Sequence, residues 1–241
     1  MAFGADRVIG DHYYIVGRTG SGKSIKALHA LQELVRENPD AGVLIVNHKN
    51  EKEINNVLPP YKDLLGRITI PSKLKNDSRI NIIPIAGEQD YKVTNLLREV
   101  YFKENFIVYI DEGYMINPRN PWLNALFTQG RSKNISVILL SQRPKLVSLF
   151  AVTQSNKIFI YNVIGNDDIK TLSNVVRGDV LTTQLTDLPD FNYVEFDAKT
   201  GKTEIKQPEK YPISFKIPLI KRPMPILPIV GIVGLVLVGS F

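Results

Sequence analysis

The chain has 241 residues, enough for one sizeable α/β domain or two small ones. With 44% hydrophobic and 22% charged residues, it has the composition of a soluble globular protein, which excludes disorder and fibrous repeats. The absence of cysteine excludes a disulfide framework, a Cys-ligated zinc site and a thiol nucleophile, and three scattered histidines argue against a His-built metal site. The net charge of +6 favours an anionic partner such as nucleic acid or lipid headgroups. Seven basic residues outnumber two acidic ones between positions 199 and 222, so this segment carries +5 of that charge.

The two ends of the chain differ. The first twelve residues contain no basic stretch followed by an apolar run, so we expect no secretory signal and a chain that starts in the cytosol. Residues 223–241 form an uncharged run of nineteen residues directly after Lys221 and Arg222, which predicts a transmembrane tail anchor. A buried terminal strand or helix is the alternative, because Pro228 limits an uninterrupted helix to about 21 Å. We therefore divide the chain into a domain (1–207), a Pro-rich basic linker (208–222) and the tail (223–241).

Hydrophobic periodicity predicts alternating strands and helices along the domain. Strands are expected at 13–16, 43–47, 68–70, 80–85, 106–110, 135–140 and 158–163. Helices are expected at 23–36, 93–102, 121–133 and 167–176, and a hairpin at 192–196 and 203–206. Because the strands are continuously apolar and are separated by helices, the pattern predicts an α/β fold with a mostly parallel sheet and helices on both faces.

A glycine-rich motif lies between the first strand and the first helix. It matches G-x-x-x-x-G-K-[ST], the pattern of a phosphate-binding loop (P-loop). Its residues are Gly17, Arg18, Thr19, Gly20, Ser21, Gly22, Lys23 and Ser24. The glycines allow successive N–H groups and the helix N-terminus to face one anionic centre. We expect the loop to bind ATP, with Lys23 at the β- and γ-phosphates and the Ser24 hydroxyl on Mg²⁺.

Two carboxylates follow the buried strand at 106–110. Asp111 and Glu112 are expected at the rim of the sheet, where the loop of the adjoining strand would hold the phosphates. Asp111 is expected to orient Mg²⁺ through its water shell, and Glu112 to polarise the attacking water as general base. The second acid favours hydrolysis by an ATPase with its own catalytic glutamate.

The next strand is flanked by two more candidates. Gln142, in the sequence Ser141-Gln142-Arg143-Pro144, is the candidate sensor of the γ-phosphate and the attacking water; a plain strand-end turn is the alternative. Arg131 precedes the same strand, and a guanidinium suits developing phosphate charge. The sequence leaves open whether Arg131 serves its own ATP, a neighbour's, or only solvates a helix end.

Taken in this order and spacing, these motifs resemble the HerA/FtsK superfamily of DNA-pumping ATPases over roughly residues 13–160. Within it, the short chain is similar to the genome-packaging ATPases of tailless icosahedral viruses with an internal membrane. The resemblance implies a ring of about six subunits, double-stranded DNA in the pore and Arg131 acting in trans. It also implies docking to vertex or capsid proteins and a place in the virion at the internal membrane, with assembly in the host cytoplasm or at its membrane. No winged helix or other DNA-reading module is evident.

Two other functions compete with packaging of DNA into a preformed capsid at a membrane-associated vertex. A filamentous-phage assembly ATPase also combines a P-loop with a membrane segment but exports single-stranded DNA, and that family would imply a chain that continues into a periplasmic domain. A nucleotide-gated membrane scaffold would bind ATP without pumping anything. Glu112, Gln142 and Arg131 argue against the scaffold, because a binding switch needs no complete hydrolytic set.

Overall fold

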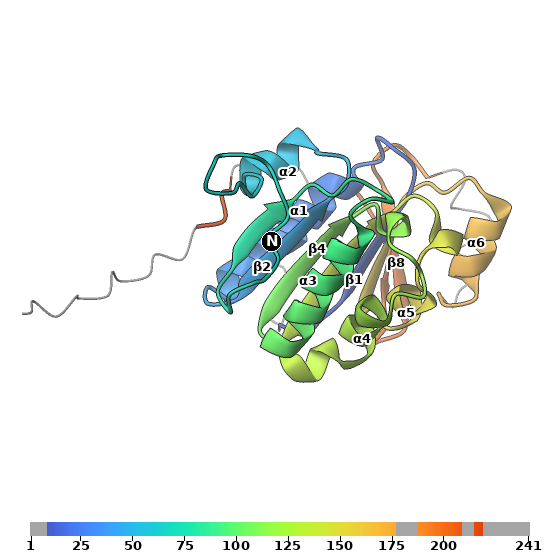
Figure 1. The fold of residues 1–241 in the computed structure, drawn as a ribbon. Helices are drawn as coiled ribbons and strands as arrows, with labels where there is room; N and C mark the ends of the chain where they lie inside the picture. Colours follow the sequence, from blue (N-terminus) through green and yellow to red (C-terminus); the bar gives the residue numbers. More distant parts are fainter. Residues whose placement is uncertain (1–8, 177–187, 209–214, 219–241) are drawn as a thin grey trace, which may run out of the picture.

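A computed structural model describes residues 9–176, 188–208 and 215–218 as one α/β unit built on a single sheet. The eight strands of this part of the chain lie in the order β3-β2-β4-β5-β1-β6-β7-β8 (Figure 1). The pairs from β3 to β6 are parallel, and β7 and β8 continue the sheet antiparallel. The strands are β1 (Tyr13–Val16), β2 (Gly42–Asn47), β3 (Arg79–Ile82), β4 (Phe106–Asp111), β5 (Ile135–Ser141), β6 (Lys157–Ile160), β7 (Tyr193–Asp197) and β8 (Lys202–Lys206). The α-helices are α1 (Lys23–Glu37), α2 (Lys52–Val57), α3 (Asp90–Lys103), α4 (Pro121–Gln129), α5 (Leu149–Thr153) and α6 (Asn166–Ser173).

Helices cover both faces of the sheet, which explains why its central strands β2, β4 and β5 are buried along their whole length (Figure 1). Val43 and Ile45 of β2 belong to a buried cluster that includes the apolar side of α1. Leu44 and Val46 alternate with them and pack in a second cluster with α3 and α4. Every residue of β2 is buried as a result. The predicted α/β fold with a mostly parallel sheet is therefore confirmed.

Several predicted boundaries are wrong. Residues 68–70 form no strand; Ile68 makes only an isolated bridge to Lys62 and is 53% exposed. The predicted helix at 121–133 is two elements, because α4 ends at Gln129 and a 3-10 helix, Gly130–Lys133, follows it. Asn134 then takes a left-handed conformation, with φ of 53°, that turns the chain into β5. The short helices α2 and α5 escaped prediction because five or six residues carry little periodicity.

The strand order corrects a second expectation. The strands that carry the P-loop and the carboxylates do not adjoin, since β5 lies between β1 and β4. All three strands are parallel, so their carboxyl ends share one edge of the sheet. The residue that ends β5 is thereby placed between the two motifs, a position that the order of elements along the sequence does not reveal.

The predicted tail, 223–241, lies outside the described residues, as do most of the predicted linker and the boundaries drawn around both. Four residues of that linker, 215–218, lie against the domain beside α2. The Ile217 N–H donates to the Val57 carbonyl over 2.9 Å, and Arg79 donates to the Pro218 carbonyl over 2.6 Å. Across the ranges that the structure describes, no helix is long and apolar enough to cross a membrane.

Candidate active site

The turn between β1 and α1 has the conformation that its glycines permit. Gly17, Gly20 and Gly22 have φ of +153°, +77° and +96°, a region that other residues rarely adopt. A Cβ at Gly17 would also lie 2.5 Å from Cβ of Tyr161. The Gly17 N–H donates to the Ser141 carbonyl at the end of β5, over 3.3 Å. The loop is therefore fixed to the neighbouring strand and opens onto the N-terminus of α1.

Lys23, the first residue of α1, is buried and turned back toward the loop. Its Nζ donates to the Arg18 carbonyl over 2.7 Å. Burial, with a further contribution from the nearby Lys49 ammonium, lowers the pKa of Lys23 to about 8. A phosphate in this position would favour the charged amine and offer it a better acceptor than a neutral carbonyl.

Asp111 and Glu112 are both buried, each 2% exposed, at the carboxyl end of β4. Burial is the main cause that raises the pKa of Asp111 to about 6, and the charge of Glu51 adds to it. Asp111 Oδ2 and Glu112 Oε2 have no hydrogen-bond partner among the described residues. Glu112 also has left-handed backbone, with φ of 51°. Unpaired buried oxygens and strained backbone together are typical of a functional site rather than of a stabilising one.

Gln142 connects the loop to the carboxylates. It immediately follows Ser141, the last residue of β5, and lies between the two motifs. The Gln142 Nε2 donates to Glu112 Oε1 over 2.6 Å, and the Thr19 hydroxyl donates to Gln142 Oε1 over 3.0 Å. A movement of the Thr19 side chain can therefore be transmitted to Glu112 through the Gln142 amide.

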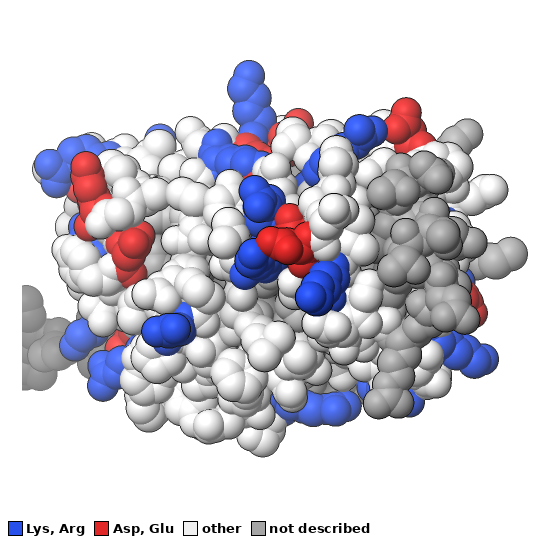
Figure 2. Space-filling model, turned by 90° about the vertical axis from the view of Figure 1, so that its right-hand side faces the viewer, with Lys and Arg blue, Asp and Glu red and all other residues white. Residues whose placement is uncertain are grey.

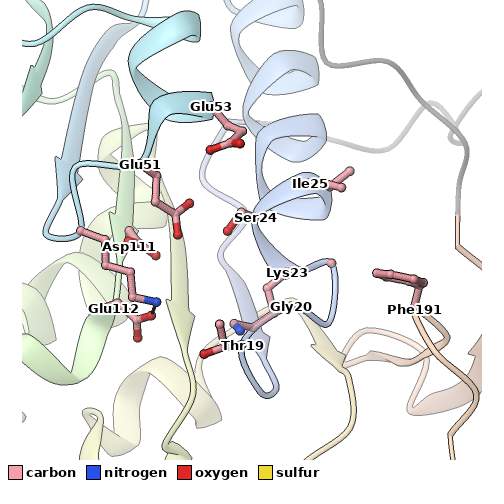
Figure 3. A pocket seen from close by; sticks show the side chains of 12 residues that line it. Thr19, Gly20, Lys23, Ser24, Ile25, Glu51, Glu53, Asp111, Glu112 and Phe191 are labelled. Atoms are coloured by element: carbon pink, nitrogen blue, oxygen red, sulfur yellow. Dashed lines mark ion pairs between the residues drawn. The ribbon is translucent and has the colours of Figure 1, made fainter.

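Thr19, Lys23, Ser24, Asp111 and Glu112 line one cavity of about 380 Å³, whereas Gln142 and Arg18 line a neighbouring one (Figure 3). Figure 3 shows Asp111 and Glu112 on one side of the loop and Phe191 on the other. Sequence reasoning missed five residues of this lining: Ile25, which directly follows the P-loop motif, and Lys49, Glu51, Glu53 and Phe191. Lys49 forms an ion pair with Glu112. For Lys49, Glu51 and Glu53 the available signal was the polar run that follows the second apolar strand, and for Phe191 it was an aromatic position directly before the predicted hairpin at 192–196.

Arg131 lies apart from the other predicted site residues. It is in the 3-10 helix before β5, at the amino end of that strand, whereas the cavity lies at the carboxyl ends. Seven residues of β5 separate the two ends by about 20 Å. The Arg131 guanidinium is 66% exposed and pairs with Asp11 over 3.7 Å. Contact with its own cavity is therefore excluded in this structure, and a role in hydrolysis requires a second subunit.

A divalent cation fits the carboxyl edge, although the described residues contain no group of three or more His, Cys, Asp or Glu side chains that could hold a metal alone. Mg²⁺ in nucleotide sites typically takes one or two carboxylates together with phosphate oxygens and water. Ser24 and Asp111 both line the cavity, and the unpaired Asp111 Oδ2 would gain a partner. The donor set therefore suits Mg²⁺ that arrives with a nucleotide.

The fold, the loop and the carboxylate pair define the class of the protein, a P-loop ATPase. No protein-family model matches the chain. The chain is 31% identical over 166 residues to DNA packaging ATPase P9 of Enterobacteria phage PRD1. The matched residues make up 69% of this chain and 70% of P9. It belongs to that family of DNA packaging ATPases, and the predicted resemblance is confirmed.

Solved structures show the same fold at lower identity. The genome packaging NTPase B204 of Sulfolobus turreted icosahedral virus 2, solved with ATP-gammaS, superposes with a TM-score of 0.64 at 15% identity. The match covers 83% of this chain and 98% of B204. VirB4 of Thermoanaerobacter pseudethanolicus gives a TM-score of 0.61 at 11% identity, over 83% of this chain and 90% of VirB4. The architecture is thus shared with ATPases of different names, and the fold alone does not determine what the site of this chain does.

Proposed function

We propose that this protein hydrolyses ATP to drive double-stranded viral DNA into a preformed capsid. The observation that carries the proposal is the continuous contact from Thr19 through Gln142 to Glu112, because it joins the phosphate-binding loop to the residue that would activate water. Membership of the DNA packaging ATPase family supplies the substrate of the translocation step. A scaffold that only binds nucleotide would need no such connection.

The residues divide the work of hydrolysis by position. The loop N–H groups and Lys23 would bind the triphosphate, and Ser24 with Asp111 would hold Mg²⁺. Bound Mg²⁺ would neutralise charge on the phosphate oxygens. Glu112 would accept a proton from the attacking water at Oε2, which has no hydrogen-bond partner among the described residues, while Lys49 and Gln142 hold Oε1. Gln142, in contact with both motifs, would couple the state of the γ-phosphate to the position of Glu112.

The position of Arg131 supports assembly into a ring. Its guanidinium is exposed and lies at the opposite edge of the sheet from its own cavity. The ion pair to Asp11 is long, and such partly exposed pairs contribute about 1 kcal/mol at most. Arg131 could therefore turn to the cavity of a neighbouring subunit, as the predicted ring of about six subunits requires.

A membrane-associated vertex is the finer part of the proposal. Leu64 and Leu65 are fully or largely exposed in a loop held by the Asp63–Arg67 ion pair of 2.8 Å. That loop begins just after Val57, which binds Ile217 near the start of the uncharged run at 223–241. Two exposed leucines with basic neighbours suit anionic lipid. We therefore propose this side of the molecule for the membrane.

The surface that contacts DNA is a separate question. Near the centre of the face in Figure 2, blue and red side chains lie side by side. Ion pairs join α6 to the preceding 3-10 helix Pro144–Leu146 and its flank, Arg143–Asp168 at 3.0 Å and Lys145–Asp167. A centre of mixed sign is a poor match for a phosphate backbone. We expect DNA to contact another surface, by electrostatic backbone contacts without base reading.

ATPase assays test the central proposal. The full chain is assayed with no DNA, with duplex DNA and with single-stranded DNA, at low and moderate salt. We expect duplex to stimulate hydrolysis most, stimulation to fade as salt rises, and Lys23→Ala to abolish hydrolysis under every condition. Preference for single-stranded DNA would favour an export ATPase, and hydrolysis without any response to DNA would contradict the packaging function.

Vesicle flotation tests the membrane placement. The full chain should float with vesicles that contain anionic lipid, and deletion of residues 224–241 should leave a folded ATPase that floats less. In the truncated chain, the double substitution Leu64→Ser and Leu65→Ser should weaken the vesicle binding that is left. Phe102→Ser, which also replaces an exposed apolar residue but on α3, should not. A truncated chain that unfolds would show that the run belongs to the core.

A further inference from the structure

A second, smaller cavity adjoins the phosphate cavity on the side away from the carboxylates. It has a volume of about 140 Å³ and shares Gly22, Ile25 and Phe191 with its neighbour. Its walls include the aromatic side chains of Tyr161 and Tyr193. Because Asp111 and Glu112 lie on one side of the loop and Phe191 on the other, a nucleotide whose γ-phosphate faces the carboxylates would extend toward Phe191 (Figure 3).

Phe191 is held in an unusual way. Its backbone has φ of +64°, which is costly for an aromatic residue, and its side chain remains 51% exposed at the mouth of the cavity. The preceding Asp190 pairs with Arg18 of the P-loop over 3.4 Å, and the Asn192 N–H closes a turn to the Pro189 carbonyl over 3.0 Å. The turn is therefore tied to the loop and presents the ring to the opening.

The Phe191 ring also lies beside the N-terminus of α1, where the P-loop ends. A Cβ built on Gly22 would lie 3.4 Å from Phe191 Cδ1, so the ring is in van der Waals range of the helix N-terminus. Ile25, in the first turn of α1, is 45% exposed beside it. The floor is already occupied, since Lys26 Nζ donates to the Tyr193 hydroxyl over 3.1 Å and lies 5.0 Å above the Tyr193 ring. What the opening offers a ligand is an exposed aromatic face and an aliphatic edge.

We propose that the purine base of the bound nucleotide stacks on Phe191 at this opening, against Ile25. The inference rests on the proposed function, because it requires the triphosphate to occupy the P-loop. An aromatic ring that is half exposed contributes little to folding, whereas stacking of a base on an aromatic side chain contributes about 1–3 kcal/mol to binding. Phe191 is in this way the residue that distinguishes a nucleoside triphosphate from a bare triphosphate.

Calorimetric titration of the full chain with ATP and with inorganic tripolyphosphate, both with Mg²⁺, tests the inference. Phe191→Ala should weaken ATP binding by about 5- to 150-fold and leave tripolyphosphate binding unchanged. Phe191→Tyr should restore ATP binding, which separates stacking from a loss of folding. Phe102→Ala is the matched control, because Phe102 is 61% exposed on α3, and it should alter neither ligand.

The outcomes separate the two proposals. If Lys23→Ala weakens both ligands but Phe191→Ala leaves the affinity for each ligand as in the wild type, the base does not stack on Phe191 and the phosphate site stands. An equal loss of both ligands in Phe191→Ala would also overturn the inference, since the ring would then support the loop instead of the base. If Lys23→Ala changes neither ligand, the P-loop assignment fails, and the inference fails with it.

Discussion

Two buried aspartates at opposite ends of the sheet differ in their surroundings. Asp11 precedes β1 at the amino edge, and its two oxygens pair with Arg131 over 3.7 Å and with Lys199 over 3.5 Å. Asp111 ends β4 at the carboxyl edge, where Oδ2 has no hydrogen-bond partner among the described residues and burial raises the pKa to about 6. Asp11 is satisfied by the chain itself, and Asp111 is left to be satisfied by a ligand.

The charged side chains around the two aspartates also differ. At the carboxyl edge, Lys23, Lys49 and Glu112 are all close to one cavity, so each depends on the others and on what binds there. At the amino edge, Arg131 is exposed and its ion pair is weak. A ring would bring the amino edge of one subunit to the carboxyl edge of the next. The two edges would then form one hydrolytic site between them.

The largest expected effect tests that junction. Arg131→Ala should lower ATP turnover by roughly 10³-fold or more, because a guanidinium supplied in trans stabilises the developing phosphate charge. Lys133→Ala, in the same 3-10 helix and paired with Glu104 over 2.6 Å, is the matched control and should retain turnover. Turnover of the wild type should rise steeply with protein concentration. Steady-state phosphate release measures both.

Mixed assemblies make the test decisive. An Arg131→Ala subunit keeps an intact Glu112, and it can receive Arg131 from a Glu112→Gln neighbour. Mixing the two inactive variants should therefore recover part of the turnover. If confirmed mixed assemblies recover none at any ratio, Arg131 does not act across a subunit boundary and the junction of the two edges is wrong.

The next effect is confined to the carboxyl edge. Glu112→Gln should lower turnover by roughly 10²–10⁴-fold, the usual contribution of a general base, while ATP binding persists. The amide keeps the shape of the side chain but cannot accept the proton. Glu99→Gln, on the surface of α3 and paired with Lys103, is the control. Turnover within a few-fold of the wild type would reject Glu112 as the general base.

The carboxyl edge was largely predictable, because its chemistry lies in contiguous motifs. The P-loop fixes its own strand, turn and helix through glycines that need positive φ, and Asp111 with Glu112 simply ends a buried strand. The position of Gln142 between them was not predictable, since it depends on β5 entering the sheet between β1 and β4. Lys49 and Phe191 reach the cavity from chain positions without a motif. Contacts made by strand order and long-range packing leave no local pattern in a sequence.

The amino edge was predictable only in part. Arg131 was expected just before the strand at 135–140, but the end of the sheet at which it lies follows from the parallel pairing of β5 with both of its neighbours. Its partner Asp11 stands 120 positions earlier in the chain, and that distance gives a sequence reader no reason to connect them. The pair joins an exposed guanidinium to a buried carboxylate, and neither residue stands in a motif that points to the other. The sequence therefore identified Arg131 as a candidate residue but did not predict its position in the sheet or its ion pair with Asp11.

The smallest effects concern stability, and they should have opposite signs at the two edges. Asp111→Asn should raise the free energy of unfolding of the ligand-free protein by roughly 1–3 kcal/mol, because it removes a buried charge with an unpaired oxygen. Asp11→Asn should lower the same free energy by about 1 kcal/mol or less, because it weakens two long ion pairs. Urea denaturation of both variants at pH 7 without nucleotide measures the difference.

Ligand binding should reverse the advantage of Asp111→Asn. ATP with Mg²⁺ stabilises the folded form of each variant that binds it, and the gain in free energy of unfolding grows with the ratio of ligand concentration to Kd. The wild type and Asp11→Asn should gain that stabilisation, and Asp111→Asn should gain much less, since one cation ligand is gone. A loss of stability in ligand-free Asp111→Asn would show that this carboxylate supports the fold as Asp11 does. The contrast between a satisfied edge and an edge kept open for a ligand would then be lost.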